Sequence, residues 1–175
     1  IPVVYWENDV VSESILTTGI VKNKIIEKIF YKVAYLLEQF TAKRVSHIVC
    51  ASDSFVKMHI KRGTPANKLT EIKNWIDTSS TFYVERSKNV LFEKFKLNRN
   101  KFFVTYCGNL GVPQNVEILV NAAEMLQELS DIEFIIIGNG SREKEVIEYV
   151  KKKNLPNLKM FPLQPINMVN YVYSI

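Results

Sequence analysis

Two glycine-punctuated turns hold the residues whose types and spacing could bind a phosphate group. The first turn contains Gly108 and Gly111 and follows an apolar run at 102–106, and the second contains Gly138 and Gly140. A helix that begins directly after such a turn presents free N–H groups and the positive end of its dipole to an anion. A tight turn that binds nothing has the same residue pattern, so one turn alone leaves both interpretations open.

Apolar runs alternate with amphipathic stretches over the second half of the chain. The runs at 102–106, 133–137 and 158–161 have the continuous apolar character of strands covered on both faces, and helices are expected between them. This alternation predicts parallel βαβ units. Because parallel strands end at one edge of a sheet, both glycine turns are expected to line one crevice for a nucleotide. Neither turn matches the dinucleotide fingerprint or the phosphate loop of P-loop NTPases, which excludes both classes.

Two residues mark where the helices after these turns are expected to begin. Pro113 suits the first turn of the helix that follows the first glycine turn. Ser141 suits the N-cap of a helix that runs to about Lys153. Both helices are predicted to cover the sheet with their apolar faces.

The first half of the chain predicts a second α/β unit. Buried strands are expected at 3–6, 45–50 and 69–72, and a long amphipathic helix at 21–44. The apolar stripe of this helix is expected to face the core. The lysines near its start also suit an anionic membrane surface, which leaves peripheral membrane contact open as the alternative.

Polar side chains follow the first expected strand of this half. Asp9, Glu13 and Ser14 lie just past its carboxyl end, where open α/β sheets place ligands. They could orient a hydroxyl group of a substrate or act as a base. A role in capping a helix turn explains the same residues equally well.

Composition narrows the class of protein. The chain has 175 residues, of which 47% are hydrophobic, and a net charge of +5 that a solvated surface explains better than nucleic acid does. It opens inside an apolar run without an initiator Met and is expected to be an internal fragment. Cys50 and Cys107 fit buried, reduced thiols, and a cytoplasmic location is expected. His47 and His59 have no ligand partner at metal-binding spacing, so no metal is predicted.

Four stretches together resemble bacterial glycosyltransferases of family 4, which have the GT-B fold. The likeness is strongest to the members that build capsule, O-antigen or colanic-acid polysaccharide. The matching stretches are Asp9-Val-Val-Ser-Glu-Ser14 with Thr18-Gly-Ile-Val-Lys-Asn-Lys24; Lys68-Leu-Thr-Glu-Ile-Lys-Asn-Trp-Ile-Asp77 with the preceding Ala51-Ser52 and Arg62-Gly63; Tyr106-Cys-Gly-Asn-Leu-Gly-Val-Pro-Gln114; and Ile136-Ile-Gly-Asn-Gly140.

The resemblance implies two Rossmann-like parallel sheets of a partial GT-B fold. Residues 1–78 would be the last part of the acceptor-side domain, 79–101 an interdomain connection, and 102–175 the first part of the domain that binds the nucleotide-sugar. The resemblance also implies transfer with retention of anomeric configuration, without a metal or a cofactor. Asp9, Glu13 and Ser14 would lie on the acceptor side. The donor would contact Gly108, Asn109, Leu110, Gly111, Gln114, Gly138, Gly140 and Arg142.

Two departures from the family pattern bear on these roles. Val11-Ser12 stands where the subfamily usually has Trp-Pro, which weakens the acceptor role of Asp9 and Glu13. Gln114 and Asn115 stand where many members carry a Lys or Arg that neutralises the diphosphate. The helix dipole or a basic residue elsewhere, with Arg142 as the candidate, would have to supply that charge.

The resemblance implies that the parent protein transfers a sugar from a nucleotide-diphosphate donor to a lipid-linked or saccharide acceptor. The 175 residues alone are expected to be inactive, because catalysis needs donor, acceptor and orienting groups assembled together. A non-enzymatic Rossmann-like nucleotide-binding module is the main alternative. A scaffold that contacts the inner membrane through residues 21–44 is a second, and an RNA-binding domain has the weakest case because its aromatic residues are expected in buried strands.

Overall fold

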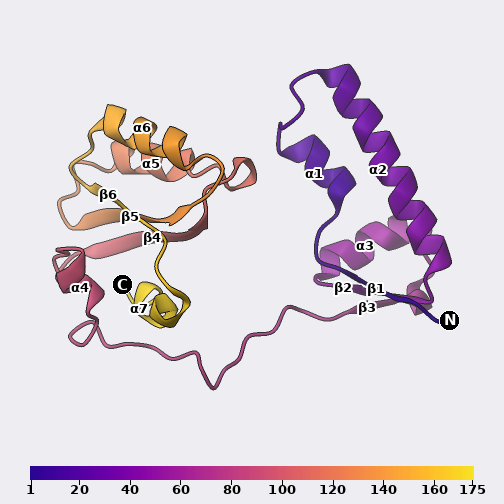
Figure 1. The fold of residues 1–175 in the computed structure, drawn as a ribbon, viewed down its shortest axis with the longest axis horizontal. Coiled ribbons are helices and arrows are strands. Elements are labelled where there is room, and N and C mark those ends of the chain that lie inside the picture. Colours follow the sequence, from indigo (N-terminus) through magenta and orange to yellow (C-terminus); the bar gives the residue numbers. More distant parts are fainter. The chain divides into compact units, whose positions relative to one another are not determined.

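The chain forms two compact α/β units, each built on a three-stranded parallel sheet (Figure 1). The computed structural model describes all residues from Ile1 to Ile175. The first unit contains Ile1–Ile76 and the second Asp77–Ile175. This is the α/β class with parallel sheets that the alternation of strands and helices predicts.

The sheet of the first unit has the order β1-β2-β3. Its strands are β1 (Val4–Glu7), β2 (His47–Cys50) and β3 (Leu69–Glu71), and Ile48 and Cys50 of the central strand are fully buried. The helices are α1 (Val11–Thr17), α2 (Lys24–Arg44), α3 (Asp53–Lys61) and the short 3-10 helix η1 (Ala66–Lys68). The side chain of Asn23 caps α2 by accepting hydrogen bonds from the amides of Ile25 and Ile26.

The prediction that the first strand is buried is wrong for most of its length. β1 has only β2 as a neighbour, so it is an edge strand of the sheet. Val4 and Trp6 are exposed, whereas Glu7 at the carboxyl end is buried. Trp6 instead packs edge-on against Trp75, which follows β3, with ring centroids 4.9 Å apart.

The apolar stripe of α2 does not face the core of the first unit, contrary to the prediction. Its exposed members include Ile29, Val33 and Leu37, while the buried residues of the helix are Glu27 and Ala42. The physical reason is that α2 packs against its neighbours through its polar face, where Glu38 binds the amide of Ser12 in α1. No helix of the structure is long and apolar enough to cross a membrane.

The sheet of the second unit has the order β4-β5-β6. Its strands are β4 (Phe102–Asn109), β5 (Ile132–Asn139) and β6 (Leu158–Phe161), and the central strand β5 is buried along most of its length. Helices α5 (Glu117–Met125) and α6 (Glu143–Lys153) cover one face of this sheet (Figure 1). The other face carries α4 (Leu91–Lys94) and α7 (Val169–Val172), with the 3-10 helix η3 (Ile166–Met168) before α7.

Two hydrophobic clusters sandwich β5. Phe134 and Ile136 pack toward Val120 of α5, while Ile135 and Ile137 pack toward Phe92 of α4. Alternate residues of β5 thus pack into hydrophobic clusters on opposite faces of the sheet, which explains why the strand is apolar without interruption. Within the predicted connection 79–101, the residues Leu91, Phe92, Phe95 and Leu97 belong to the second of these clusters.

The helices after the glycine turns begin later than their sequence signals indicate. Pro113 lies in the 3-10 helix η2 (Val112–Gln114), and Asn115, with φ of 43°, separates that turn from α5. α6 begins after Arg142, and Ser141 makes no capping hydrogen bond to it. The end of α6 at Lys153 agrees with the prediction, and Asn154 in the left-handed conformation terminates it.

Candidate functional site

The two glycine turns lie side by side at the carboxyl ends of β4 and β5. In the parallel register Gly108 pairs with Gly138, and Asn109 pairs with Asn139. The amide of Leu110 donates a hydrogen bond to the carbonyl oxygen of Asn139 at 2.7 Å. The expected shared edge therefore exists, and the second turn is hydrogen-bonded directly to the first.

Gly138 and Gly140 allow the two turns to approach this closely. A Cβ atom on Gly138 would collide with the carbonyl oxygen of Gly108, and one on Gly140 would lie 2.7 Å from the amide nitrogen of Leu110. Gly140 also has φ of 154°, a backbone conformation that side chains rarely adopt. These two glycines thus have a packing role that does not depend on any ligand.

Gly111 has a different environment, because its neighbours are the ends of polar side chains. A Cβ atom there would lie 2.7 Å from Oε1 of Gln114 and 2.9 Å from Nδ2 of Asn109. Both amide side chains are exposed and can move. Leu110 is fully buried, so this residue can offer a ligand only backbone groups. The first turn therefore combines a fixed backbone with exposed amides.

Tyr106, in the strand that precedes the first turn, stabilises that turn. Its hydroxyl donates a hydrogen bond to the carbonyl oxygen of Asn109 at 2.6 Å. Burial, with a smaller contribution from Cys107, raises the pKa of Tyr106, so the hydroxyl keeps its proton for this bond. The turn is thus held by a side chain of its own strand as well as by the neighbouring turn.

Arg142, the predicted source of positive charge, is already paired with carboxylates. Its guanidinium contacts Glu117 at the start of α5 and Oε1 of Glu145 at 2.6 Å. The hydrogen bonds to Glu145, followed by the charge of Glu117, raise the pKa of Arg142. Its backbone amide also donates to the carbonyl oxygen of Leu110 at 2.9 Å. A phosphate would reach this guanidinium only by replacing one of the carboxylates.

A largely apolar cavity of about 340 Å³ opens beside the second turn. Gly138, Phe161 and Pro162 line it from the sheet side, and Glu143 and Ile147 line it from α6. Its volume is within the range of small-molecule sites, and its walls suit a flat ring better than a charged group.

The family assignment rests on the segment that contains both glycine turns. Residues 87–174 match the family model described as glycosyl transferases group 1. This chain belongs to the family of group 1 glycosyl transferases. The glycine turns, β5 and the apolar cavity all lie within the matched residues.

A relative of known sequence is similar to most of this chain. WcaI of Escherichia coli (strain K12), which is named as a colanic acid biosynthesis glycosyl transferase, is 27% identical over 137 residues. The alignment covers 76% of this chain and 33% of WcaI.

Several solved structures have the same fold. The structure of Anabaena Alr3699/HepE in complex with UDP and glucose superposes with a TM-score of 0.70 at 17% identity, over 99% of this chain and 44% of HepE. WaaG, a glycosyltransferase involved in lipopolysaccharide biosynthesis, superposes with a TM-score of 0.61 at 13% identity, over 98% of this chain and 48% of WaaG. The chain has the partial GT-B fold that its motifs predict, and it spans less than half the length of these relatives.

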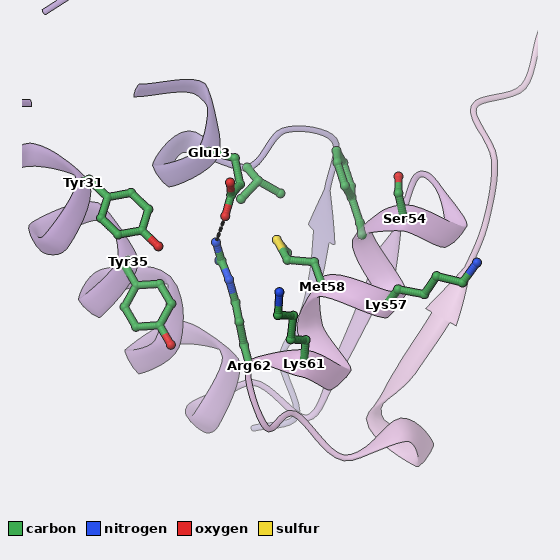
Figure 2. Close-up of a pocket in the computed structure, with 10 residues that line it drawn as sticks. Glu13, Tyr31, Tyr35, Ser54, Lys57, Met58, Lys61 and Arg62 are labelled. Atoms are coloured by element: carbon green, nitrogen blue, oxygen red, sulfur yellow. Dashed lines mark hydrogen bonds and ion pairs between the residues drawn. The ribbon is translucent and has the colours of Figure 1, made fainter. Parts of the chain in front are cut away.

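The first unit contains a larger cavity, of about 660 Å³, among α1, α2 and α3. Figure 2 shows Tyr31 and Tyr35 of α2 on one side of Arg62, Met58 of α3 on the other, and Glu13 of α1 above the guanidinium. Of the three predicted acceptor residues only Glu13 lines this cavity. Ser14 donates its hydroxyl proton to the carbonyl oxygen of Val10 at 3.1 Å.

Arg62 organises this cavity, although sequence analysis gave it no role of its own. Its guanidinium donates to Glu13 at 2.7 Å, to Glu38 at 2.8 Å and to the Ser12 hydroxyl at 2.9 Å. Burial disfavours its charged form, but the hydrogen bonds to Glu38 and Glu13 outweigh this effect and raise the pKa of Arg62. One residue thus joins three helices.

The partners of Arg62 are far from it in the sequence, which is why spacing did not reveal them. Glu38 is separated from Arg62 by 24 positions and Ser12 by 50. The available signal was that Arg62, Ser12 and Glu13 all fall within the stretches that carry the family resemblance. Asp9, in contrast, is exposed at the end of β1.

Proposed function

We propose that this chain carries the donor-diphosphate turn and part of the acceptor site of a retaining, metal-independent glycosyltransferase. The observation that supports it best is the hydrogen-bonded pair of glycine turns at one edge of the second sheet. The full-length protein moves a sugar from a nucleotide-sugar donor to a lipid-linked or saccharide acceptor. The 175 residues alone hold too few of the groups that must act together to be active.

The diphosphate contacts the backbone of the first turn, at Gly108 and Gly111. Backbone amides of this turn supply the hydrogen-bond donors, and we assign neither a metal nor a cofactor to the site. Asn109 and Gln114 add neutral hydrogen-bond donors. The nucleoside occupies the apolar cavity beside Gly138 and Phe161.

The acceptor lies in the cavity around Glu13 and Arg62. Two tyrosine rings, a carboxylate and several cations line one space there, a combination that suits the apolar face and hydroxyl groups of a saccharide. Lys61 and Arg62 add positive charge that favours a phosphate-bearing, lipid-linked acceptor. Glu13 orients an acceptor hydroxyl through its exposed carboxylate oxygen.

The product of the full-length protein is a cell-surface polysaccharide. The names of WcaI, for colanic acid biosynthesis, and of WaaG, for lipopolysaccharide biosynthesis, support this class of product. Family 4 membership and a role in capsule or O-antigen synthesis fit the same motifs.

A titration of the chain with UDP, GDP and dTDP, followed by amide NMR shifts, tests the donor site. We expect one diphosphate to move the amides of Gly108, Asn109, Gly111, Gly138 and Gly140 together, and the matching monophosphate to move them less. A Gly111→Ala variant should keep the fold and lose affinity by about tenfold or more, because the added methyl group keeps the diphosphate away from the backbone.

Two outcomes would count against this proposal. If none of these amides moves in a well-dispersed spectrum, the turns have only a packing role. If UDP and its sugar conjugates bind with equal affinity and the full-length protein transfers no sugar, the chain is a non-enzymatic nucleotide-binding module. Unchanged affinity in Gly111→Ala would remove the first turn from the donor site.

The exposed face of α2 supports a peripheral contact with an anionic membrane. Ile25, Ile29, Val33 and Phe40 leave large apolar surfaces uncovered along this helix. Lys22, Lys28 and Lys32 lie along or just before it and are exposed. An apolar stripe flanked by lysines is typical of helices that lie in the interface of an anionic bilayer. Such contact would bring the enzyme to a lipid-linked acceptor at the inner membrane.

Vesicle co-sedimentation tests this contact. Replacing Lys22, Lys28 and Lys32 by Glu should weaken binding to anionic vesicles by about 100-fold, since each lysine contributes about 1 kcal/mol near such a surface. The matched control replaces Lys144, Lys151 and Lys152 of α6, which are also exposed, and makes the same change in net charge. An equal loss of vesicle affinity in both variants would contradict a specific role for α2. Binding of the unmodified chain to neutral vesicles but not to anionic ones would contradict it as well.

A further inference from the structure

Three side chains with metal-binding chemistry meet inside the first unit. Glu7 and Cys50 are paired residues at the carboxyl ends of β1 and β2, so their side chains point to the same face of the sheet. His59 of α3 packs over that face, and its Nε2 lies 2.8 Å from Oε2 of Glu7. The carboxylate oxygen, the thiol sulfur and the imidazole nitrogen all lie within 4.8 Å of one another.

Sequence spacing gave His59 no partner and predicted no metal. The partners lie in two different strands, and only the parallel register of β1 and β2 brings them to one point. All three residues are at most 2% exposed. A buried cluster of an acid, a thiol and an imidazole is uncommon, because each group needs a polar partner away from water.

We propose that Glu7, Cys50 and His59 bind a zinc ion that joins β1, β2 and α3. A thiolate together with an imidazole favours zinc over magnesium, calcium or manganese. A thiolate, a carboxylate and Zn²⁺ sum to zero charge, which a buried site accommodates far better than an isolated ion. The fourth position is left for a water molecule.

The geometry requires only small movements of the ligands. At ordinary zinc–ligand distances, neighbouring ligand atoms of a tetrahedral site are about 3.3–3.7 Å apart. The three atoms already lie within 4.8 Å of one another, on a strand–strand–helix framework. On binding, the cation displaces the thiol proton of Cys50 to solvent, and the single proton of the neutral His59 imidazole lies on Nδ1, on the side of the Thr64 hydroxyl. This ion connects β1, β2 and α3, keeps one position open, and is separate from the donor turns, which belong to the second unit.

An outer contact orients the imidazole for this role. Nδ1 of His59 lies 3.4 Å from the hydroxyl oxygen of Thr64, which is also buried. Ligating histidines commonly use their second ring nitrogen in a hydrogen bond of this kind, which fixes the ring. Nε2 then points at Glu7 and the sulfur of Cys50.

Cobalt(II) is a suitable spectroscopic probe, because a thiolate ligand gives it a charge-transfer band in the near ultraviolet. We expect the reduced chain to bind one cobalt ion with this band and to lose the band when zinc is added. Zinc in large excess over its dissociation constant should raise the melting temperature by about 5–10 °C.

The chain offers matched controls, since it has two cysteines and two histidines. Cys107→Ser and His47→Ala should keep the cobalt band. Cys50→Ser should abolish it, and the near-isosteric Glu7→Gln should keep the band but weaken cobalt binding by about tenfold or more.

Three results would overturn the proposal. The first, which depends on no variant, is the absence of both a cobalt band and a zinc-dependent melting shift in the unmodified chain. The second is loss of the band in folded Cys107→Ser, which would place the bound thiolate in the second unit. The third is a band that persists in folded Cys50→Ser, which would show that Cys50 does not supply the thiolate.

Discussion

Replacing Gly138 by Ala is expected to destabilise the second unit by about 3 kcal/mol, because it overfills a packed junction. The added methyl group would meet the carbonyl oxygen of Gly108, a backbone atom of the paired strand, and then the side chain of Leu110. Neither neighbour can move away, since Gly108 lies in the ladder between β4 and β5 and Leu110 is fully buried. Relief would require the two strands to separate at their carboxyl ends.

Hydrogen exchange followed by mass spectrometry measures this effect within the second unit. Amides of β4 and β5 should exchange about 100-fold faster in Gly138→Ala than in the unmodified chain. Gly111→Ala is the matched control, because its methyl group meets only the movable ends of Gln114 and Asn109. Similar exchange in Gly138→Ala and the unmodified chain would show that the two turns are not packed as described.

Replacing Arg62 by Met is expected to destabilise the first unit by about 3 kcal/mol, because it removes one partner from a largely buried charge network. Glu38 would keep its negative charge with a side chain only 14% exposed, and the Ser12 hydroxyl would lose a donor. Glu13 contributes less to the loss, since its side chain is 50% exposed and water can solvate it. Met retains most of the aliphatic packing of Arg62, so the loss reports the charge network.

Tryptophan fluorescence during thermal unfolding measures this change. Both tryptophans, Trp6 and Trp75, belong to the unit that contains Arg62. A fall in melting temperature on the order of 15 °C is expected for a unit of this size. The matched control is Lys57→Met in α3, which removes the ion pair between Lys57 and Asp53. The side chains of this pair are 75% and 59% exposed, so the melting temperature should change little. A fall of the same size in both variants would refute the buried network.

The strands and the glycine turns could be predicted from the sequence because their signals are local. The continuous apolar run at 133–137 is β5, and 158–161 matches β6 at both ends. Gly140 lies in the expected turn, whereas Gly138 is still part of β5, where it pairs with Gly108 of β4 and brings the two strand ends together. These features depend on residues close together in the chain.

The remaining features depend on which surfaces meet, and a local pattern does not carry that information. The stripe of α2 has the period of a core helix, but the helix packs through Glu38 and its neighbours instead. The first strand has the composition of a central strand, yet within these residues it pairs only with β2 and leaves Val4 and Trp6 exposed. The contacts of Arg62 and His59 likewise join segments separated by dozens of positions.

Leu110 connects the two glycine turns. Its amide is bound to Asn139, its carbonyl oxygen accepts from the amide of Arg142, and its side chain is fully buried between them. These contacts hold the two turns together as one packed unit. In the donor site proposed above, a ligand would therefore meet a largely preformed backbone, which lowers the entropy cost of ordering the site.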